Sequence, residues 1–93
     1  HKNTQKAVDY INYINQNYNK VIWITVAGMS NALSGVVSAN TQFPVIACPP
    51  FKDQTDMMVN INSTLQMPSK VPVMTVICPS NATLCCKRIF DMM

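Results

Sequence analysis

The chain has 93 residues, of which 48% are hydrophobic and only 12% are charged, and its formal net charge is +3. This length fits one small domain, and its scattered lysines include no basic run with interleaved aromatic residues, so no nucleic acid partner is expected. Polar residues or prolines interrupt every apolar run before the ~18–20 residues of a membrane span, so no membrane partner is expected. The charged fraction is about half the usual share, which predicts a surface covered by further sequence or by other subunits.

The first half of the chain predicts a helix, a strand, a helix and a strand. Apolar residues at helical spacing predict an amphipathic helix over residues 4 to about 16, with Ala7, Ile11, Ile14 and Tyr18 on its inner side. Residues 21–26 are apolar, β-branched and not alternating, which predicts a strand buried on both faces of a parallel sheet. A second helix is predicted over about residues 31–40, and a second short buried strand over residues 45–48.

The second half predicts two more helices around a third strand. A helix from about residue 55 carries Met58, Ile61 and Leu65 on one face, and Pro68 ends it. A third strand is predicted over residues 71–78. A final helix follows from Pro79, with Ala82, Cys85, Ile89 and Met93 on its inner side.

Strands that alternate with helices predict an α/β fold with a doubly wound parallel sheet. Three strands make a thin sheet, so at least one strand and one helix are expected to be missing upstream. Ligands of such folds bind at the carboxyl edge of the strands, where residues 27–31, 49–55 and 79–81 form the strand-to-helix loops.

The cysteines are expected to be buried free thiols of a cytosolic protein, because Cys48 and Cys78 end apolar strands and Cys85 and Cys86 lie within a helix. No metal site is expected, since the chain has no C-x-x-C pair and a single histidine.

The segment after the first strand, residues 27–31, is the first candidate site. Its backbone N–H groups would meet at a helix start beside the small side chains of Ser30 and Asn31, which suits phosphate or carboxylate. An ordinary capped helix would give the same pattern. His1 is the only side chain suited to proton transfer near neutral pH, and Lys2 could hold an anion. A solvated pair is the alternative for these two residues.

The same segment carries a family resemblance. Residues 27–35 read A-G-M-S-N-A-L-S-G, residues 38–41 read S-A-N-T, and residues 44–50 read P-V-I-A-C-P-P. These closely resemble the phosphoribosylaminoimidazole carboxylase family of animal type, the carboxylase half of a bifunctional purine-synthesis enzyme. That family typically reads A-G-R-S-N-G-L-G, S-G-N-T and P-V-I-x-C-P-P. His1-Lys2 looks like the end of its S-A-H-K/R motif, and residues 65–69 look like its L-x-x-P-S/R segment.

The resemblance implies that residues 1–93 are a partial domain of a flavodoxin-like three-layer αβα sandwich, assembled as an octamer in the cytoplasm. It implies addition of carbon dioxide to C4 of 5-aminoimidazole ribonucleotide without ATP, biotin or another cofactor. His1 would move the proton at C4, and Lys2 would support the nascent carboxylate. Carbon dioxide or carboxylate would bind around the loop residues Gly28, Ser30, Asn31 and Ala32.

Departures from the family pattern keep two other hypotheses open. Met29 stands where the family commonly has Arg, and Ala32, Ser34 and Ala39 replace glycines. The family's upstream G-S-x-S-D loop is absent from the sequence. A divergent, weakly active or inactive homologue that serves as an oligomerisation scaffold is therefore one alternative. The bacterial and plant mutase on the same fold is another, although the Ser30-Asn31 and C-P-P segments favour the animal type.

Overall fold

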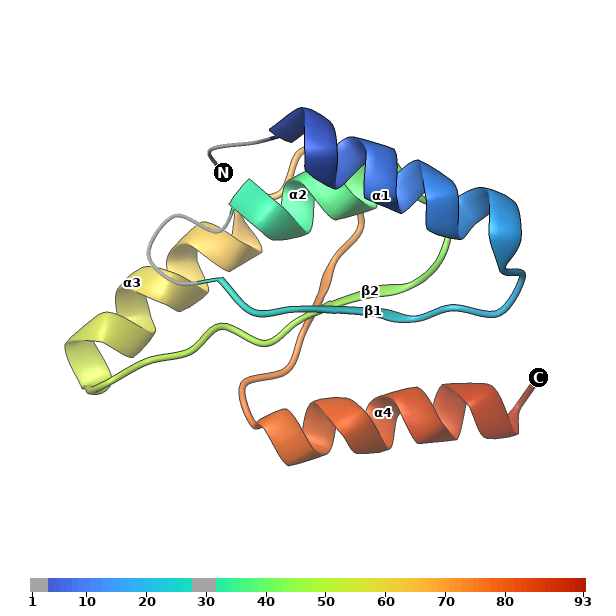
Figure 1. Ribbon diagram of the computed structural model, residues 1–93. Coiled ribbons are helices and arrows are strands. Elements are labelled where there is room, and N and C mark those ends of the chain that lie inside the picture. The colour runs from blue at the N-terminus through green and yellow to red at the C-terminus, as the bar shows by residue number, and fades with distance from the viewer. Residues whose placement is uncertain (1–3, 28–31) are drawn as a thin grey trace.

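The computed structural model describes residues 4–27 and 32–93. These ranges form four helices and a three-stranded sheet, in an order that alternates helix with strand. Figure 1 shows how these elements are arranged. The elements are α1 (Thr4–Asn17), β1 (Trp23–Thr25), α2 (Ala32–Ala39), β2 (Val45–Ala47), α3 (Gln54–Leu65), β3 (Met74–Thr75) and α4 (Pro79–Asp91). None of the described helices is both long and apolar enough to cross a membrane.

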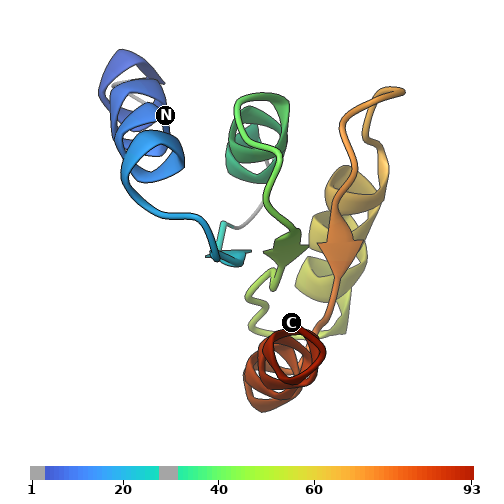
Figure 2. The same cartoon turned by 90° about the vertical axis from the view of Figure 1, so that its right-hand side faces the viewer.

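The sheet is parallel throughout, with β2 between β1 and β3. Trp23 pairs with Val45, and Ile46 pairs with Met74. Figure 2 shows α1 and α2 on one face of the sheet and α4 on the other, which makes three layers. The predicted α/β fold with a parallel sheet is confirmed, although each strand is shorter than the apolar run that predicted it.

The core is divided by β2, whose successive side chains point to opposite faces of the sheet. Val45 packs with Ile11 of α1 and Val37 of α2 on one face, and all three are buried. Ile46 packs with Ala82 of α4 on the other face. All three residues of β2 are buried, as its apolar sequence predicts for a strand covered on both sides.

The prediction that the first strand is buried on both faces is wrong for this chain. Only Thr25 of β1 is buried, whereas Ile24 is 42% exposed and the following Val26 is 61% exposed. The physical reason is position, because β1 is the last strand at its edge of the described sheet and α4 lies beneath β2 rather than beneath β1 (Figure 2).

The predicted inner face of the third helix is also wrong. Met58 and Leu65 are 64% and 63% exposed, and the buried residues of α3 are Asn60 and Thr64. Figure 1 shows that α3 runs out past the end at which the strands of the described sheet finish. A polar contact ties its inner side to the preceding connection, because the Asn60 amide donates to the Pro50 carbonyl. The Thr64 hydroxyl donates to the Asn60 carbonyl within the helix.

The two outer helices follow their predicted faces only in part. Ile11 of α1 and Ala82 of α4 are buried, and their neighbours at helical spacing are half-buried. Tyr18 lies beyond the end of α1 and is exposed, and so is Met93 beyond the end of α4.

Candidate functional site at the carboxyl edge of the sheet

Three strand-to-helix connections leave the same edge of the sheet, because all three strands run in one direction. They follow Thr25, Ala47 and Thr75, the last residues of β1, β2 and β3. This is the arrangement that the sequence predicts for the candidate site. Most of the described part of these connections is apolar, so its chemistry depends on a few polar groups.

A buried hydrogen bond fixes the two ends of the connection between β1 and α2. The hydroxyl oxygens of Thr25 and Ser34 are 2.6 Å apart, and both side chains are buried. Leu33 packs against the core cluster on the same side. The first turn of α2 is therefore held against the end of β1, at the point where backbone N–H groups of a helix start are available.

Most of the predicted site residues lie outside the described residues. His1, Lys2, Gly28, Ser30 and Asn31 are in this group, as is Met29. Their roles stay predictions.

Ala32 is the one predicted site residue that the structure describes. It is the first residue of α2 and is exposed. Nearby Gly35 of α2 lies beside the connection that follows α3, since a Cβ there would lie 3.6 Å from the Met67 sulfur.

Local contacts hold the connection between β2 and α3. Pro49 is fully buried, and Pro50 accepts the hydrogen bond from Asn60. Asp53 caps α3 by accepting from the Asp56 N–H at 2.8 Å, while the Asp56 carboxylate accepts from the Lys52 N–H at 2.9 Å. Asp56 lies in the first turn, as predicted, where the helix dipole favours a carboxylate.

An apolar cavity of about 530 Å³ lies where these connections meet the start of α4. Sequence reasoning did not find this cavity. The available signal was the pair of C-P dipeptides, Cys48-Pro49 and Cys78-Pro79, each placed at the end of a predicted strand. The cavity wall also includes Val26 and Ile77.

The two cysteines of the cavity wall differ in environment. The Cys48 thiol is buried and donates to the Ile77 carbonyl at 3.5 Å. Burial and the nearby Cys78 raise the pKa of Cys48. Cys78 is exposed, so its predicted burial is wrong; the chain bends at this residue into the start of α4. Its sulfur lies 3.1 Å from the Ser80 hydroxyl, and hydrogen bonds from that hydroxyl and from the Asn81 backbone lower the pKa of Cys78.

A larger hollow of about 680 Å³ lies at the opposite, amino edge. Its wall is polar, but its side chains bond to one another. The Asn15 amide donates to the Asn40 carbonyl at 2.7 Å, and the Thr41 hydroxyl donates to the Asn15 side-chain oxygen at 2.7 Å. These bonds tie α1 to the connection between α2 and β2. The polar groups of this hollow therefore have a structural role.

Comparison with known proteins assigns the family. The model of the AIR carboxylase family matches residues 1–93. The chain belongs to this family. It is 45% identical to phosphoribosylaminoimidazole carboxylase of Archaeoglobus fulgidus, over 97% of the chain and 48% of that protein. It is 37% identical to the Drosophila melanogaster bifunctional phosphoribosylaminoimidazole carboxylase/phosphoribosylaminoimidazole succinocarboxamide synthetase, over 90% of the chain and 19% of that protein.

Solved structures of the family show the same fold. The chain superimposes on the crystal structure of Treponema denticola PurE with a TM-score of 0.87 and 36% sequence identity, covering 95% of the chain and 55% of PurE. The chain thus spans about half the length of the archaeal and Treponema relatives. The predicted family and the flavodoxin-like αβα arrangement are confirmed.

Proposed function

We propose that this chain is part of an enzyme that adds carbon dioxide to C4 of 5-aminoimidazole ribonucleotide, giving the 4-carboxylate for purine synthesis without ATP or a cofactor. The observation that carries this proposal is the family match along residues 1–93, which includes the segment between β1 and α2. That segment joins the carboxyl edge of the sheet to a helix start, a position suited to an anionic group.

The protein does not need to activate the substrate carbon, because the aminoimidazole is already an enamine-like carbon nucleophile. Its C4 electron pair forms a bond to the carbon of carbon dioxide, and one C–O π pair moves to oxygen to give a carboxylate. The proton on C4 must then leave so that the ring regains its aromaticity. We assign this proton to His1, whose ordinary pKa suits transfer near neutral pH, and assign stabilisation of the carboxylate to Lys2.

The loop would hold the carbon dioxide and the product carboxylate. Donors around Gly28, Ser30, Asn31 and Ala32 suit the growing negative charge on oxygen, the role of an oxyanion site. The hydrogen bond between Thr25 and Ser34 supports this proposal, since it fixes the backbone on both sides of the loop. We also propose that the protein acts in the cytoplasm as a homo-octamer within a bifunctional polypeptide, as the resemblance implies.

The test is a carboxylation assay on the natural polypeptide that carries these residues, with aminoimidazole ribonucleotide and bicarbonate but no ATP. We expect product to form, and we expect His1→Asn to lower kcat by roughly 10²–10⁴-fold, the usual contribution of a general base. Lys87→Asn, which removes an exposed charge from α4, is the control and should leave the rate unchanged. Equal rates in the His1 variant and the unchanged protein would remove His1 from the mechanism.

A second candidate function is an inactive or weakly active scaffold, and Met29 favours it because the family commonly has Arg there. Loss of a charge-assisted contact weakens binding by about 1.5–3 kcal/mol. Calorimetry with aminoimidazole ribonucleotide separates the two functions. An inactive scaffold gives no heat of binding, whereas the carboxylase gives a saturable one.

A further inference from the structure

Two cysteines line the same apolar cavity at the carboxyl edge of the sheet. Cys48 follows β2 and Cys78 follows β3, and both belong to the wall of the cavity of about 530 Å³ that meets the start of α4. Cys48 is buried, whereas Cys78 is exposed. The cavity wall therefore carries one sheltered thiol and one thiol that solvent can reach.

The two cysteines lie close together because neighbouring parallel strands deliver them to one edge. The Val76 N–H donates to the Ala47 carbonyl at 2.9 Å, so the backbone remains paired just past the end of β3. The Cys48 thiol donates to the Ile77 carbonyl at 3.5 Å. A single peptide bond joins that carbonyl to Cys78, so the Cys48 sulfur lies within ~7 Å of the Cys78 Cα. The two sulfurs are therefore within reach of each other through side-chain rotation.

The two thiols differ in reactivity for physical reasons. Hydrogen bonds from the Ser80 hydroxyl and the Asn81 backbone lower the pKa of Cys78, which favours the nucleophilic thiolate. Burial and the neighbouring Cys78 raise the pKa of Cys48, which favours its protonated form. An exposed thiolate beside a sheltered thiol is the arrangement of redox-sensing cysteines, in which one sulfur is oxidised and the other then condenses with it.

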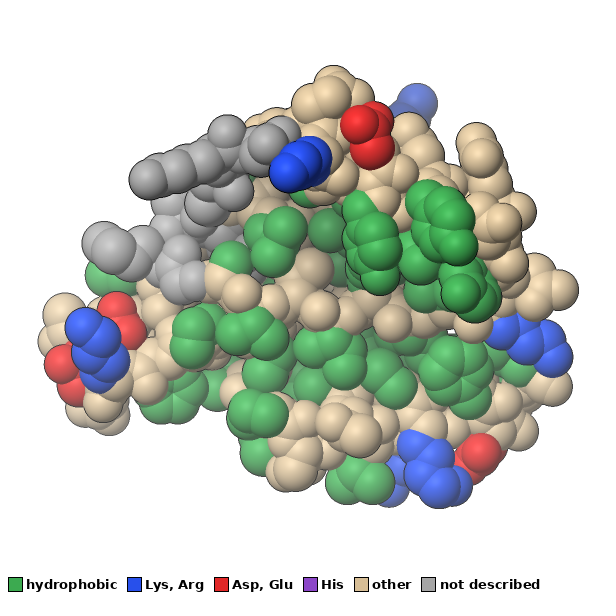
Figure 3. Space-filling model, in the orientation of Figure 1, with side chains coloured by type: hydrophobic (Ala, Val, Ile, Leu, Met, Phe, Trp, Pro, Cys, Tyr) green, Lys and Arg blue, Asp and Glu red, His purple; other side chains and the backbone are tan. Residues whose placement is uncertain are grey.

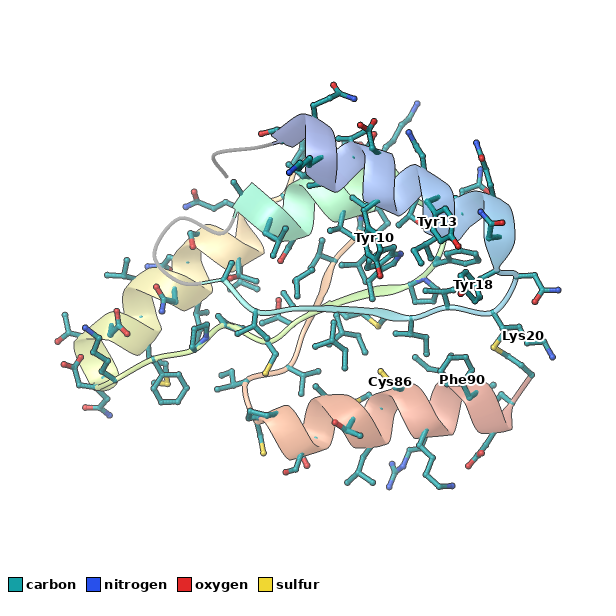
Figure 4. The ribbon with its side chains drawn as sticks, in the orientation of Figure 1. Tyr10, Tyr13, Tyr18, Lys20, Cys86 and Phe90 are labelled. Atoms are coloured by element: carbon teal, nitrogen blue, oxygen red, sulfur yellow. The ribbon has the colours of Figure 1, made fainter. Side chains whose placement is uncertain are left out.

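The remaining cysteines, Cys85 and Cys86, have a different position. They lie within α4 and pack against the core cluster that contains Ile46. Figure 4 shows Cys86 on the side of α4 that faces the sheet, and burial raises the pKa of this thiol. Adjacent residues of a helix do not face each other, so these two sulfurs are not placed to bond to one another. They serve as internal controls for the first pair.

The surroundings of Cys48 and Cys78 favour a neutral oxidant. None of the described residues that line the cavity is charged, and its wall includes the apolar side chains of Val26, Phe51 and Ile77. Figure 3 shows hydrophobic side chains across the middle of one face of the molecule, with charged side chains toward its periphery. A hydroperoxide is small and neutral, and it needs no charged partner to enter such a site.

We propose that Cys78 and Cys48 form a redox-active pair that reacts with hydroperoxides. The Cys78 thiolate attacks the terminal peroxide oxygen and the O–O bond breaks, which leaves a sulfenic acid on Cys78 and an alkoxide or hydroxide that takes a proton from water. The Cys48 sulfur then attacks the Cys78 sulfur, and the sulfenic hydroxyl leaves as water with the Cys48 proton. The two thiols lose two electrons in total, and the hydroperoxide that accepts them is reduced to an alcohol, or to water when it is hydrogen peroxide.

The disulfide would join the connection after β2 to the start of α4. Both segments lie at the carboxyl edge of the sheet, beside the candidate site, so oxidation would restrain this edge and narrow the cavity. A dithiol reductant would reverse the change. The proposal depends on the two thiols and the cavity, and it holds whether or not the polypeptide is catalytically active.

Peroxide treatment of the natural polypeptide that carries these residues tests the proposal. The probe is hydrogen peroxide in small excess, followed by alkylation of the remaining thiols and digestion with trypsin without a reductant. Cleavage after lysine places Cys48 in residues 21–52 and Cys78 in residues 71–87. We expect mass spectrometry to find these two peptides joined with the loss of two hydrogen atoms, and fragment ions to place the bond between Cys48 and Cys78. Dithiothreitol should separate the peptides.

Matched variants identify the sulfurs that react. Cys78→Ser should lower the yield of the joined peptides by at least ~10-fold, because the thiolate that attacks the peroxide is absent. Cys85→Ser removes a thiol from the same tryptic peptide and should leave the yield unchanged. In Cys48→Ala the sulfenic acid on Cys78 has no sulfur to condense with, so dimedone should trap it.

Three outcomes would overturn the proposal. The first is a bond from Cys48 to Cys85 or Cys86 in place of Cys78. The second is an equal yield of joined peptides in the Cys78→Ser and Cys85→Ser variants. The third is a Cys78 that stays reduced, or that is oxidised to a sulfinic acid without any disulfide, in the unchanged polypeptide.

Discussion

β1 and β2 are neighbouring three-residue strands of similar apolar character, yet their environments differ sharply. All of β2 is buried, whereas Ile24 at the centre of β1 is 42% exposed. β2 has a strand on each side and a helix on each face. In the described part of the chain β1 has a strand on one side only, and α4 lies beneath β2 rather than beneath β1 (Figure 2). An apolar, β-branched run therefore predicts a strand that is buried on both faces. Of these two strands, the described residues bury only β2 in this way.

The largest expected effect separates the centres of the two strands. Ile46→Ala should lower the free energy of unfolding by about 2–5 kcal/mol, because it leaves a cavity in a closed core. Ile24→Ala should lower it by less than ~1 kcal/mol, since much of that side chain is already in water. Urea denaturation of both variants measures the difference. Similar losses would show that β1 is covered in solution and would remove the contrast between the strands.

The second prediction concerns the buried end of β1. Ser34→Ala removes the partner of the Thr25 hydroxyl and should cost about 1–3 kcal/mol, because a buried hydroxyl is left without its bond. Ser69→Ala, at an exposed position, is the control. In a double-mutant cycle with Thr25→Val, the double variant should lose less unfolding free energy than the sum of the two single losses, since neither hydroxyl is then left without its partner. Additive losses would mean that the two side chains do not stabilise each other.

Much of the fold could be predicted from the sequence, because hydrophobic periodicity and turn residues determine local structure. The order of helices and strands, the parallel sheet and the first-turn position of Asp56 all follow from nearby residues. The inner face of α3 could not be predicted in this way. Its burial depends on a contact between Asn60 and the distant Pro50 carbonyl, and apolar spacing carries no information about such a bond.

The sequence predicted where the candidate site lies, but not which groups line it. The carboxyl edge follows from strand direction alone, and the connections lie there as expected. The roles of the predicted loop residues came from family resemblance and stay predictions. The apolar cavity beside Cys78 depends on how α4 packs against two strand ends, which the two C-P dipeptides alone do not specify.

The third prediction tests how α3 is held beyond the sheet. Asp53→Ala removes its N-cap and should lower the free energy of unfolding by about 1 kcal/mol. Asp91→Ala breaks the exposed ion pair with Lys87 and should cost no more than ~0.5 kcal/mol. In the Asp53→Ala variant, amide hydrogen exchange should become faster mainly in α3, because this helix has fewer packing contacts than the sheet. Unchanged exchange in α3 would mean that packing rather than the cap holds this helix.

The fourth prediction compares the thiol at the end of β2 with the exposed thiol that follows β3. Hydrogen bonds to Ser80 and Asn81 lower the pKa of Cys78, so iodoacetamide should modify it at a lower pH than an ordinary thiol, whose pKa is about 8.5. Burial raises the pKa of Cys48, so its reaction should be slower and should need a higher pH. Mass spectrometry of each cysteine across a pH series measures both midpoints.

Matched variants decide whether the Ser80 hydrogen bond causes the lower pKa of Cys78. Ser80→Ala should move the alkylation midpoint of Cys78 to a higher pH, whereas Thr83→Ala removes a hydroxyl that bonds to Pro79 and should leave it in place. The two thiols change the stability of the folded chain with pH in opposite directions. The raised pKa of Cys48 contributes stability that is full below the ordinary thiol pKa and is lost as the pH rises past it, while the lowered pKa of Cys78 favours the folded chain at high pH. Cys48→Ala should therefore flatten the loss of stability above pH ~8.5, and a steeper loss would contradict the burial of this thiol.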